Sequence, residues 1–145
     1  MKLFTIGFTK KSAETFFGML NKAEATRVVD IRLNNVSQLA GFAKRDDLRF
    51  FLKQLCEADY VHMPDFAPTK EILDRYKKDK GDWAVYEVSF LKLMRERNIE
   101  EKMAGLIKDS DCLLCSEADP DQCHRRLVAE YLKERWRNMN IRHLR

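Results

Sequence analysis

Long apolar runs are absent from this 145-residue chain. No stretch approaches the ~18–20 consecutive apolar residues of a membrane span, so we expect no transmembrane helix. No charged and apolar leader with a small-residue cleavage site is present either, so we expect no signal peptide and a cytoplasmic protein. In that compartment the four cysteines, Cys56, Cys112, Cys115 and Cys123, are expected to be reduced thiols rather than a disulfide framework.

The common phosphate-binding motifs are also missing. There is no glycine-rich loop of the G-x-x-x-x-G-K type and no G-x-G-x-x-G. A phosphatase-type loop would need an arginine six residues after Cys123, where Ala129 stands, and no glycine lies between them. The sequence therefore excludes the cysteine-centred phosphate cradle of such enzymes.

Metal-binding patterns are weak. Cys112 and Cys115 have the C-x-x-C spacing, but residues three apart in a strand point to opposite faces, so we interpret both as core residues. A zinc site made of Cys115, Cys123, His124 and His143 is conceivable, but its spacing is unlike that of common structural zinc sites. We therefore predict no metal and no cofactor.

The length fits a single domain over residues 1–145, near the commonest domain size. The apolar fraction of 45% is normal for a globular protein with a hydrophobic core. No internal repeat, low-complexity tract or linker divides the chain.

Short apolar segments alternate with amphipathic ones. Strands are expected at Lys2–Phe8, Arg27–Arg32, Tyr60–Met63, Cys112–Ser116 and Ile141–Leu144. Between them we expect helices that start at Ser12, near Asp46, near Thr69, at Trp83 (with a break near Asn98) and at Asp119, with Pro120 in the first position. Such alternation implies parallel pairing and right-handed crossovers. The sequence predicts an α/β fold: a mostly parallel five-stranded sheet with helices on both faces, of unspecified strand order.

Unusual polar residues fall at the predicted strand ends. Because the carboxyl ends of parallel strands share one edge of a sheet, residues far apart in the sequence can meet there. The candidates are Gly7 and Thr9 after strand one, Asp30 and Arg32 after strand two, Glu117 after strand four, Cys123, His124 and Arg125 at the start of the next helix, and His143 at strand five. We predict a site at this edge.

Cys123 is the candidate nucleophile. A helix N-terminus together with His124 and Arg125 would stabilise a thiolate, so we expect its pKa to fall. The alternative is that Cys123 packs inward as a small apolar group. Asp30 and Glu117 are candidate general acids or bases, if burial raises their pKa values.

Anion binding is the second expected role of this edge. Arg32 and Arg125 could clamp a phosphate or a carboxylate, although Arg32 could instead pair with Asp30 or Glu117. Gly7 either lets a ligand approach the backbone or permits a tight turn.

These motifs occur together in one known family. The combination consists of Thr5-Ile6-Gly7-Phe8-Thr9, Val29-Asp30-Ile31-Arg32 with Ser37 beyond it, Leu114-Cys115-Ser116-Glu117, Cys123-His124-Arg125 and Arg142-His143-Leu144. It resembles the domain of unknown function 488 family nearly end to end. The resemblance implies a small cytoplasmic α/β protein with no established activity, and it adds Ser37 to the ligand-binding candidates. Asn35 and Thr9 depart from the proline and serine usual in that family.

Three functional hypotheses follow. The first is an enzyme for a phosphate-containing substrate, a nucleotide or nucleic acid. The second is a nucleic-acid-binding module, because residues 121–145 carry seven basic and three acidic side chains, an excess equal to the whole net charge of +4. The third is a buried ionic network that only fixes the corner between strand and helix. The oligomeric state is not predicted.

Overall fold

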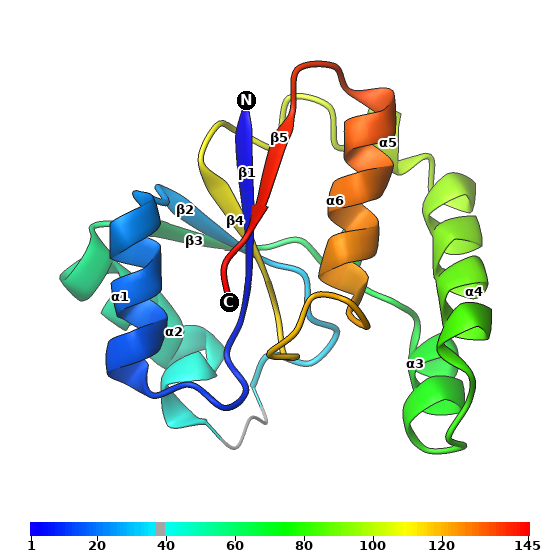
Figure 1. The fold of residues 1–145 in the computed structure, drawn as a ribbon, viewed down its shortest axis with the longest axis horizontal. Helices are drawn as coiled ribbons and strands as arrows, with labels where there is room; N and C mark the ends of the chain where they lie inside the picture. Colours follow the sequence, from blue (N-terminus) through cyan, green and yellow to red (C-terminus); the bar gives the residue numbers. More distant parts are fainter. Residues whose placement is uncertain (37–39) are drawn as a thin grey trace.

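The computed structural model describes residues 1–36 and 40–145. Ser37 lies outside the described residues. The fold is a single α/β unit around a five-stranded, all-parallel sheet of order β3-β2-β4-β1-β5 (Figure 1). The strands are β1 Lys2–Gly7, β2 Arg27–Asp30, β3 Asp59–His62, β4 Asp111–Cys115 and β5 Asn140–His143. The predicted fold class is confirmed.

Helices cover both faces of the sheet (Figure 1). One face carries α1 Ala13–Ala23, α2 Arg45–Phe51 and the π-helical turn η2 Leu52–Cys56. The other carries α3 Lys70–Lys77, α4 Trp83–Glu96, α5 Ile99–Lys102 and α6 His124–Arg135. Two 3₁₀ turns, η1 Gly41–Ala43 and η3 Pro64–Phe66, complete the described elements. Each face has its own hydrophobic core, because alternate strand residues point to opposite sides.

Several helix ends follow the predicted local chemistry. The Ser12 hydroxyl accepts from the Thr15 N–H, and the Thr69 hydroxyl accepts from the Ile72 N–H, so both residues act as N-caps. Asn98, with φ of 55°, separates α4 from α5 at the predicted break. No helix in the described part of the chain is long and apolar enough to cross a membrane.

The start of α6 differs from the prediction. Asp119 does not cap this helix and Pro120 is not its first residue, because α6 begins at His124 with Cys123 as its N-cap residue. Asp119 Oδ1 instead accepts from the Asp121 N–H at 2.9 Å, which is a local turn. An eight-residue loop, 116–123, therefore joins β4 to α6.

The fold creates a crevice beside β4. The connection after β2 leads to α2 on one face, whereas the connection after β4 leads to α6 on the other. Ligands of open α/β sheets bind where neighbouring strands send their connections to opposite sides. The paired ends Asp30↔Leu114 and Gly7↔Cys115 place this crevice at the predicted edge of the sheet.

Candidate functional site

A cleft of about 210 Å³ opens at the ends of β2 and β4. The segment after β2 forms one wall, β4 and the start of α6 form the base, and α3 and α4 form the opposite wall. The lining residues that matter for its chemistry are Arg32, Tyr76, Lys77, Trp83, Tyr86, Cys115, Glu117, Cys123 and His124. The bottom of the cleft thus carries thiol and imidazole groups, and its walls carry cationic and aromatic side chains.

The base of the cleft holds a cluster of Cys115, Cys123 and His124, here called the thiol–imidazole cluster. Cys115 is the last residue of β4, and Cys123 and His124 begin α6. The two sulfurs and one imidazole nitrogen lie within 4.8 Å of one another. The Cys115 Sγ to His124 Nδ1 distance is 3.3 Å. The three residues are 5%, 2% and 7% exposed, so their polar atoms meet one another rather than bulk water.

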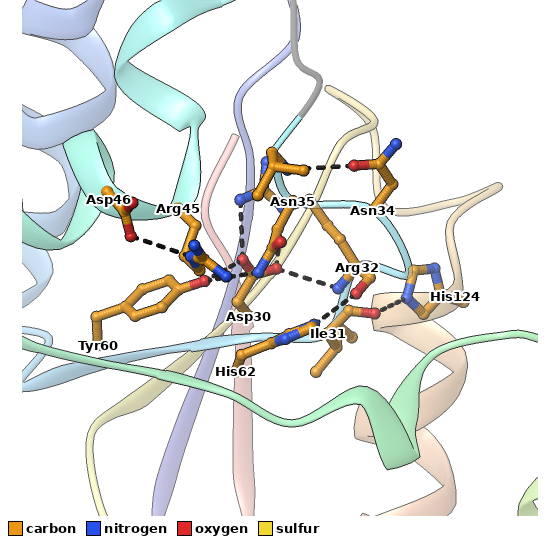
Figure 2. A network of polar contacts seen from close by, with 11 residues as sticks. Asp30, Ile31, Arg32, Asn34, Asn35, Arg45, Asp46, Tyr60, His62 and His124 are labelled. Carbon is orange, nitrogen blue, oxygen red and sulfur yellow. Dashed lines mark hydrogen bonds and ion pairs between the residues drawn. The ribbon is translucent and has the colours of Figure 1, made fainter.

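The His124 ring is oriented by backbone. Its Nε2 lies 2.7 Å from the carbonyl oxygen of Ile31 (Figure 2). Because a carbonyl can only accept, Nε2 carries the proton, and in the neutral ring Nδ1 presents its lone pair to Cys115. Phe90 packs beside the ring at 5.5 Å between centroids. The backbone just after β2 therefore fixes the tautomer of a residue on α6.

The pKa values of the two thiols are shifted in opposite directions. Burial raises the pKa of Cys123 well above its usual value, and the adjacent Cys115 sulfur raises it further. Burial also opposes ionisation of Cys115, but a hydrogen bond from Cys123, the Arg125 charge and nearby backbone N–H groups outweigh it and lower the pKa. The prediction that the Cys123 pKa falls is wrong, because Cys123 is buried; the more acidic thiol is Cys115.

Asp30 and Arg32 form a buried ion pair beside the cleft (Figure 2). Arg32 donates from Nε and Nη2 to the two carboxylate oxygens at 2.9 and 2.8 Å, and from its backbone N–H at 3.1 Å. The Tyr60 hydroxyl donates to the same carboxylate at 2.6 Å. Burial and the Asp30 carboxylate together raise the pKa of Tyr60. The alternative in which Arg32 pairs with Asp30 is confirmed.

Arg32 retains one unused donor group. Within the described residues, its Nη1 is the buried side-chain nitrogen without a hydrogen-bond partner, although the side chain is only 2% exposed. A buried donor that lacks a partner costs ~1–3 kcal/mol. The guanidinium also lies over the Phe8 ring at 5.3 Å. Arg32 is itself one of the residues that line the cleft.

The opposite wall is aromatic with a charged rim. Trp83 and Tyr86 stack at 5.0 Å, and Tyr76 packs on Tyr86 at 5.0 Å. Lys77 Nζ lies 2.6 Å from a Glu117 carboxylate oxygen, and both side chains are roughly half exposed. This ion pair spans the rim where the loop 116–123 faces α3.

Arg125 does not reach the cleft. It is fully buried, and it donates to the backbone carbonyls of Glu117 and Ala118 and to the Thr5 hydroxyl. The predicted clamp of Arg32 and Arg125 around one anion is therefore not formed. Arg125 instead holds the loop 116–123 against β1.

Gly7 of β1 packs against the same loop, and His143 of β5 contacts Thr5, a partner of Arg125. A Cβ on Gly7 would lie 1.6 Å from the Glu117 carbonyl oxygen, so the close approach involves the protein's own backbone. His143 Nδ1 lies 2.7 Å from the Thr5 hydroxyl that Arg125 also contacts. Burial, and then the positive charge of Arg125, lower the pKa of His143.

The predicted residues thus separate into groups. Arg32, Glu117, Cys123 and His124 line the cleft. Gly7, Asp30, Arg125 and His143 are held in contacts behind it, and the exposed Thr9 lines a separate depression with Lys10 and Asp119. The convergence at one sheet edge is found, but four of the ten predicted residues line the cleft and four others lie in the contacts behind it.

Cys115 is a functional candidate that the sequence analysis interpreted as a core residue, although it named Cys115 in the conceivable zinc set. Cys112 does lie in the core on the α1 face, but Cys115 lines the cleft. The feature of the sequence that could have indicated this role is its position. Cys115 is the last residue of a buried strand, eight residues before Cys123 and nine before His124. His143, the fourth residue of the conceivable zinc set, contacts Thr5 instead.

Comparison with known proteins decides the family. The profile of the Domain of unknown function DUF488 matches residues 12–132, which is most of the chain. The chain belongs to this family. The DUF488 match includes all three members of the thiol–imidazole cluster and leaves β1 and β5 outside. The function of the DUF488 family is unknown, so membership assigns no reaction. No curated protein and no solved structure matches the chain significantly.

Proposed function

We propose that this protein is an enzyme that acts on a small phosphate-containing molecule of the nucleotide class, bound in the cleft. The observation that carries the proposal is the buried, unpartnered Nη1 of Arg32, a residue that lines the same cleft as the thiol–imidazole cluster. Buried polar groups in folded proteins nearly always have partners. A ligand oxygen would complete the hydrogen bonding of Arg32.

The charges of the cleft favour an anion. Asp30 occupies Nε and Nη2 of Arg32, which leaves the two N–H groups of Nη1 for ligand oxygens. Lys77 lies on the opposite rim, where it pairs with Glu117. A phosphate that enters between these walls meets a guanidinium held rigid by a buried carboxylate, together with a mobile ammonium group.

The aromatic wall favours a planar ring beside that anion. Tyr76 and Trp83 provide partly exposed rings, backed by the buried Tyr86, and stacking of a nucleobase on such a side chain contributes ~1–3 kcal/mol. A phosphate and a planar ring within one molecule describe a nucleotide. The cleft of about 210 Å³ suits one such unit or part of it.

The catalytic groups are assigned to the base and rim of the cleft. The thiol–imidazole cluster provides the reacting groups, with Cys123 retained from the sequence prediction and Cys115 added to it. Glu117 is proposed to transfer protons once Lys77 turns to the substrate. Asp30 becomes a positioning residue, since its carboxylate is fully buried against Arg32 and Tyr60. A cytoplasmic location belongs to the same proposal, because the four cysteines are free thiols.

Binding of nucleoside monophosphates, measured by calorimetry, tests this proposal. Trp83→Ala and Lys77→Ala are expected to weaken binding about tenfold each, because each removes a contact worth ~1–2 kcal/mol. Lys92→Ala is the matched control, since Lys92 is an exposed α4 lysine paired with Glu96, and it should bind like the wild type. Absence of binding by the wild type, or equal affinity in all four proteins, would refute the proposal.

The nucleic-acid module is the second candidate. Four of the seven basic residues in the segment 121–145 already have partners: Arg125 with backbone carbonyls, and Arg126, Arg135 and Arg145 with carboxylates. Such pairs reduce the positive surface available to phosphates. This candidate predicts binding of single-stranded nucleic acid that weakens steeply with salt and persists in Cys123→Ser.

A further inference from the structure

We infer that Cys115, Cys123 and His124 form a binding site for a zinc ion, with a fourth coordination position open to the cleft. The inference rests on the proposed function only for the role of that open position. Metal binding itself follows from the geometry of the three side chains and is measured separately from nucleotide binding.

The spacing of the ligand atoms fits one ion. Zinc binds thiolate sulfur at ~2.3 Å and imidazole nitrogen at ~2.0 Å, so tetrahedral ligands lie ~3.5 Å apart. Cys115 Sγ and His124 Nδ1 are 3.3 Å apart, and all three ligand atoms are within 4.8 Å of one another. Cys123 occupies the N-cap position of α6, but its sulfur makes no capping hydrogen bond to the helix. Small rotations of the side chains would bring all three atoms to one centre.

The imidazole is prepared for coordination. Histidines that bind metals nearly always donate their other ring N–H to a carbonyl or carboxylate, which fixes the tautomer. His124 does this through Nε2 and the Ile31 carbonyl at 2.7 Å, so Nδ1 is the nitrogen available to an ion. The contact joins the segment just after β2 to the start of α6 and holds the ring in place before an ion arrives.

The charges and the donor types select zinc. A buried cation is costly unless charge and coordination compensate it. Two thiolates and a neutral imidazole balance the double charge of Zn²⁺ while two protons leave for solvent. Two sulfurs and one nitrogen are soft donors that suit zinc and exclude magnesium and calcium, which prefer oxygen.

Three protein ligands are the number typical of a catalytic zinc. Structural sites use four protein ligands, whereas catalytic sites use three and leave one position for water or substrate. All three members of the cluster line the same cleft as Arg32 and Glu117. The open position would therefore face the substrate that the proposed function places there.

The zinc content of the purified full-length protein is the test. After equilibration with equimolar Zn²⁺ under reducing conditions and desalting, we expect one zinc per chain in the wild type. Cys115→Ser, Cys123→Ser and His124→Gln should each retain less than a tenth of that. Cys56→Ser is the matched control, because Cys56 lies on the opposite side of the sheet near Phe17, and it should retain one zinc.

A spectrum of the wild type keeps the test valid if a cluster variant fails to fold. Co²⁺ added to the reduced wild type should give a thiolate-to-cobalt charge-transfer band, and Zn²⁺ should displace it. Folded wild type and Cys56→Ser that hold no zinc and give no such band would overturn the inference. Metal-free protein that still binds nucleotides would leave the proposed function standing, whereas zinc without nucleotide binding would refute that function alone.

Discussion

At the scale of single residues, Asp30 shows how a site residue can be structural. Its carboxylate is fully buried and accepts from Arg32 and Tyr60, so the negative charge is committed to holding Arg32 in the cleft wall. Removal of one partner of a buried ion pair leaves an uncompensated charge, which costs ~3–5 kcal/mol.

Asp30→Asn is therefore expected to lower the free energy of unfolding by ~3–5 kcal/mol, because Arg32 stays buried without its counter-charge. Urea denaturation of the pure protein measures this loss. Asp46→Asn is the control, since the Arg45–Asp46 pair is exposed and should leave the denaturation midpoint unchanged. A stable Asp30→Asn protein would contradict the structural role.

Gly7→Ala tests the contact between β1 and the loop 116–123. The added Cβ would lie 1.6 Å from the Glu117 carbonyl oxygen, so we expect a loss of ~1–3 kcal/mol in stability from overpacking. Gly18→Ala is the matched control, because Gly18 lies in α1 and the added Cβ would meet no atom within 4 Å other than those of its chain neighbours and its own helix backbone. That change should stabilise the protein by ~0.5–1 kcal/mol. Thermal unfolding of the two variants distinguishes them.

His143 predicts a pH dependence of stability. Its pKa is lowered from 6.5 in the folded protein, by burial and by Arg125, so the unfolded chain binds the proton more readily. Stability should therefore fall as the pH drops through 6.5. His143→Gln, which keeps a polar partner for Thr5, should lose less stability between pH 7.5 and pH 5 than the wild type. Parallel curves for the two proteins would refute this linkage.

Cys115 illustrates where residue-level prediction stops. A cysteine within a buried apolar strand has the composition of a core residue, and Cys112 in the same strand is one. Only the position at the strand end exposes the Cys115 sulfur to His124, and that contact depends on how the start of α6 packs against β4 and against Ile31, the residue after β2. The sequence alone gives the positions of Cys115 and His124 along the chain, but not that their side chains are in contact.

At the scale of elements, the alternation of strands and helices was predictable because each has a distinct apolar period. The start of α6 was not, because Asp119 and Pro120 are typical of both a helix N-terminus and a turn. The turn forms because Arg125 binds the carbonyls of the loop from behind, a contact between residues that no local pattern encodes. The π-helical turn η2, which directly follows α2, also lacks a local sequence signal.

Arg125→Lys tests the dependence of this loop on one side chain. Lysine keeps the charge but cannot donate to the Glu117 and Ala118 carbonyls and the Thr5 hydroxyl at once. Each hydrogen bond to a charged group contributes ~1.5–3 kcal/mol, so a loss of at least ~1.5 kcal/mol is expected. Amide hydrogen exchange in residues 116–123 should accelerate, whereas exchange in α1 should not. Unchanged protection of the loop would show that Arg125 does not hold it.

At the scale of the whole molecule, sheet order assembles the site. With β4 between β2 and β1, the loop after β4 lies between the segment after β2 and the end of β1. One side of this loop lines the cleft with Glu117 and Cys123, beside Cys115 at the end of β4, and its other side rests on Arg125. The prediction that these residues meet at one edge of the sheet was correct, because parallel strands end at the same edge. Which of them line the cleft and which lie behind it depends on the strand order, and the sequence did not specify that order.

A nucleotide titration, followed through the chemical shifts of the backbone amides by NMR, tests most directly whether the cleft beside β4 is the binding site. We expect chemical-shift changes concentrated at Arg32, Lys77, Trp83 and residues 115–124, with little change at β5 and the end of α6. Shifts that follow the basic residues of α6 and β5 and spare the cleft would contradict it.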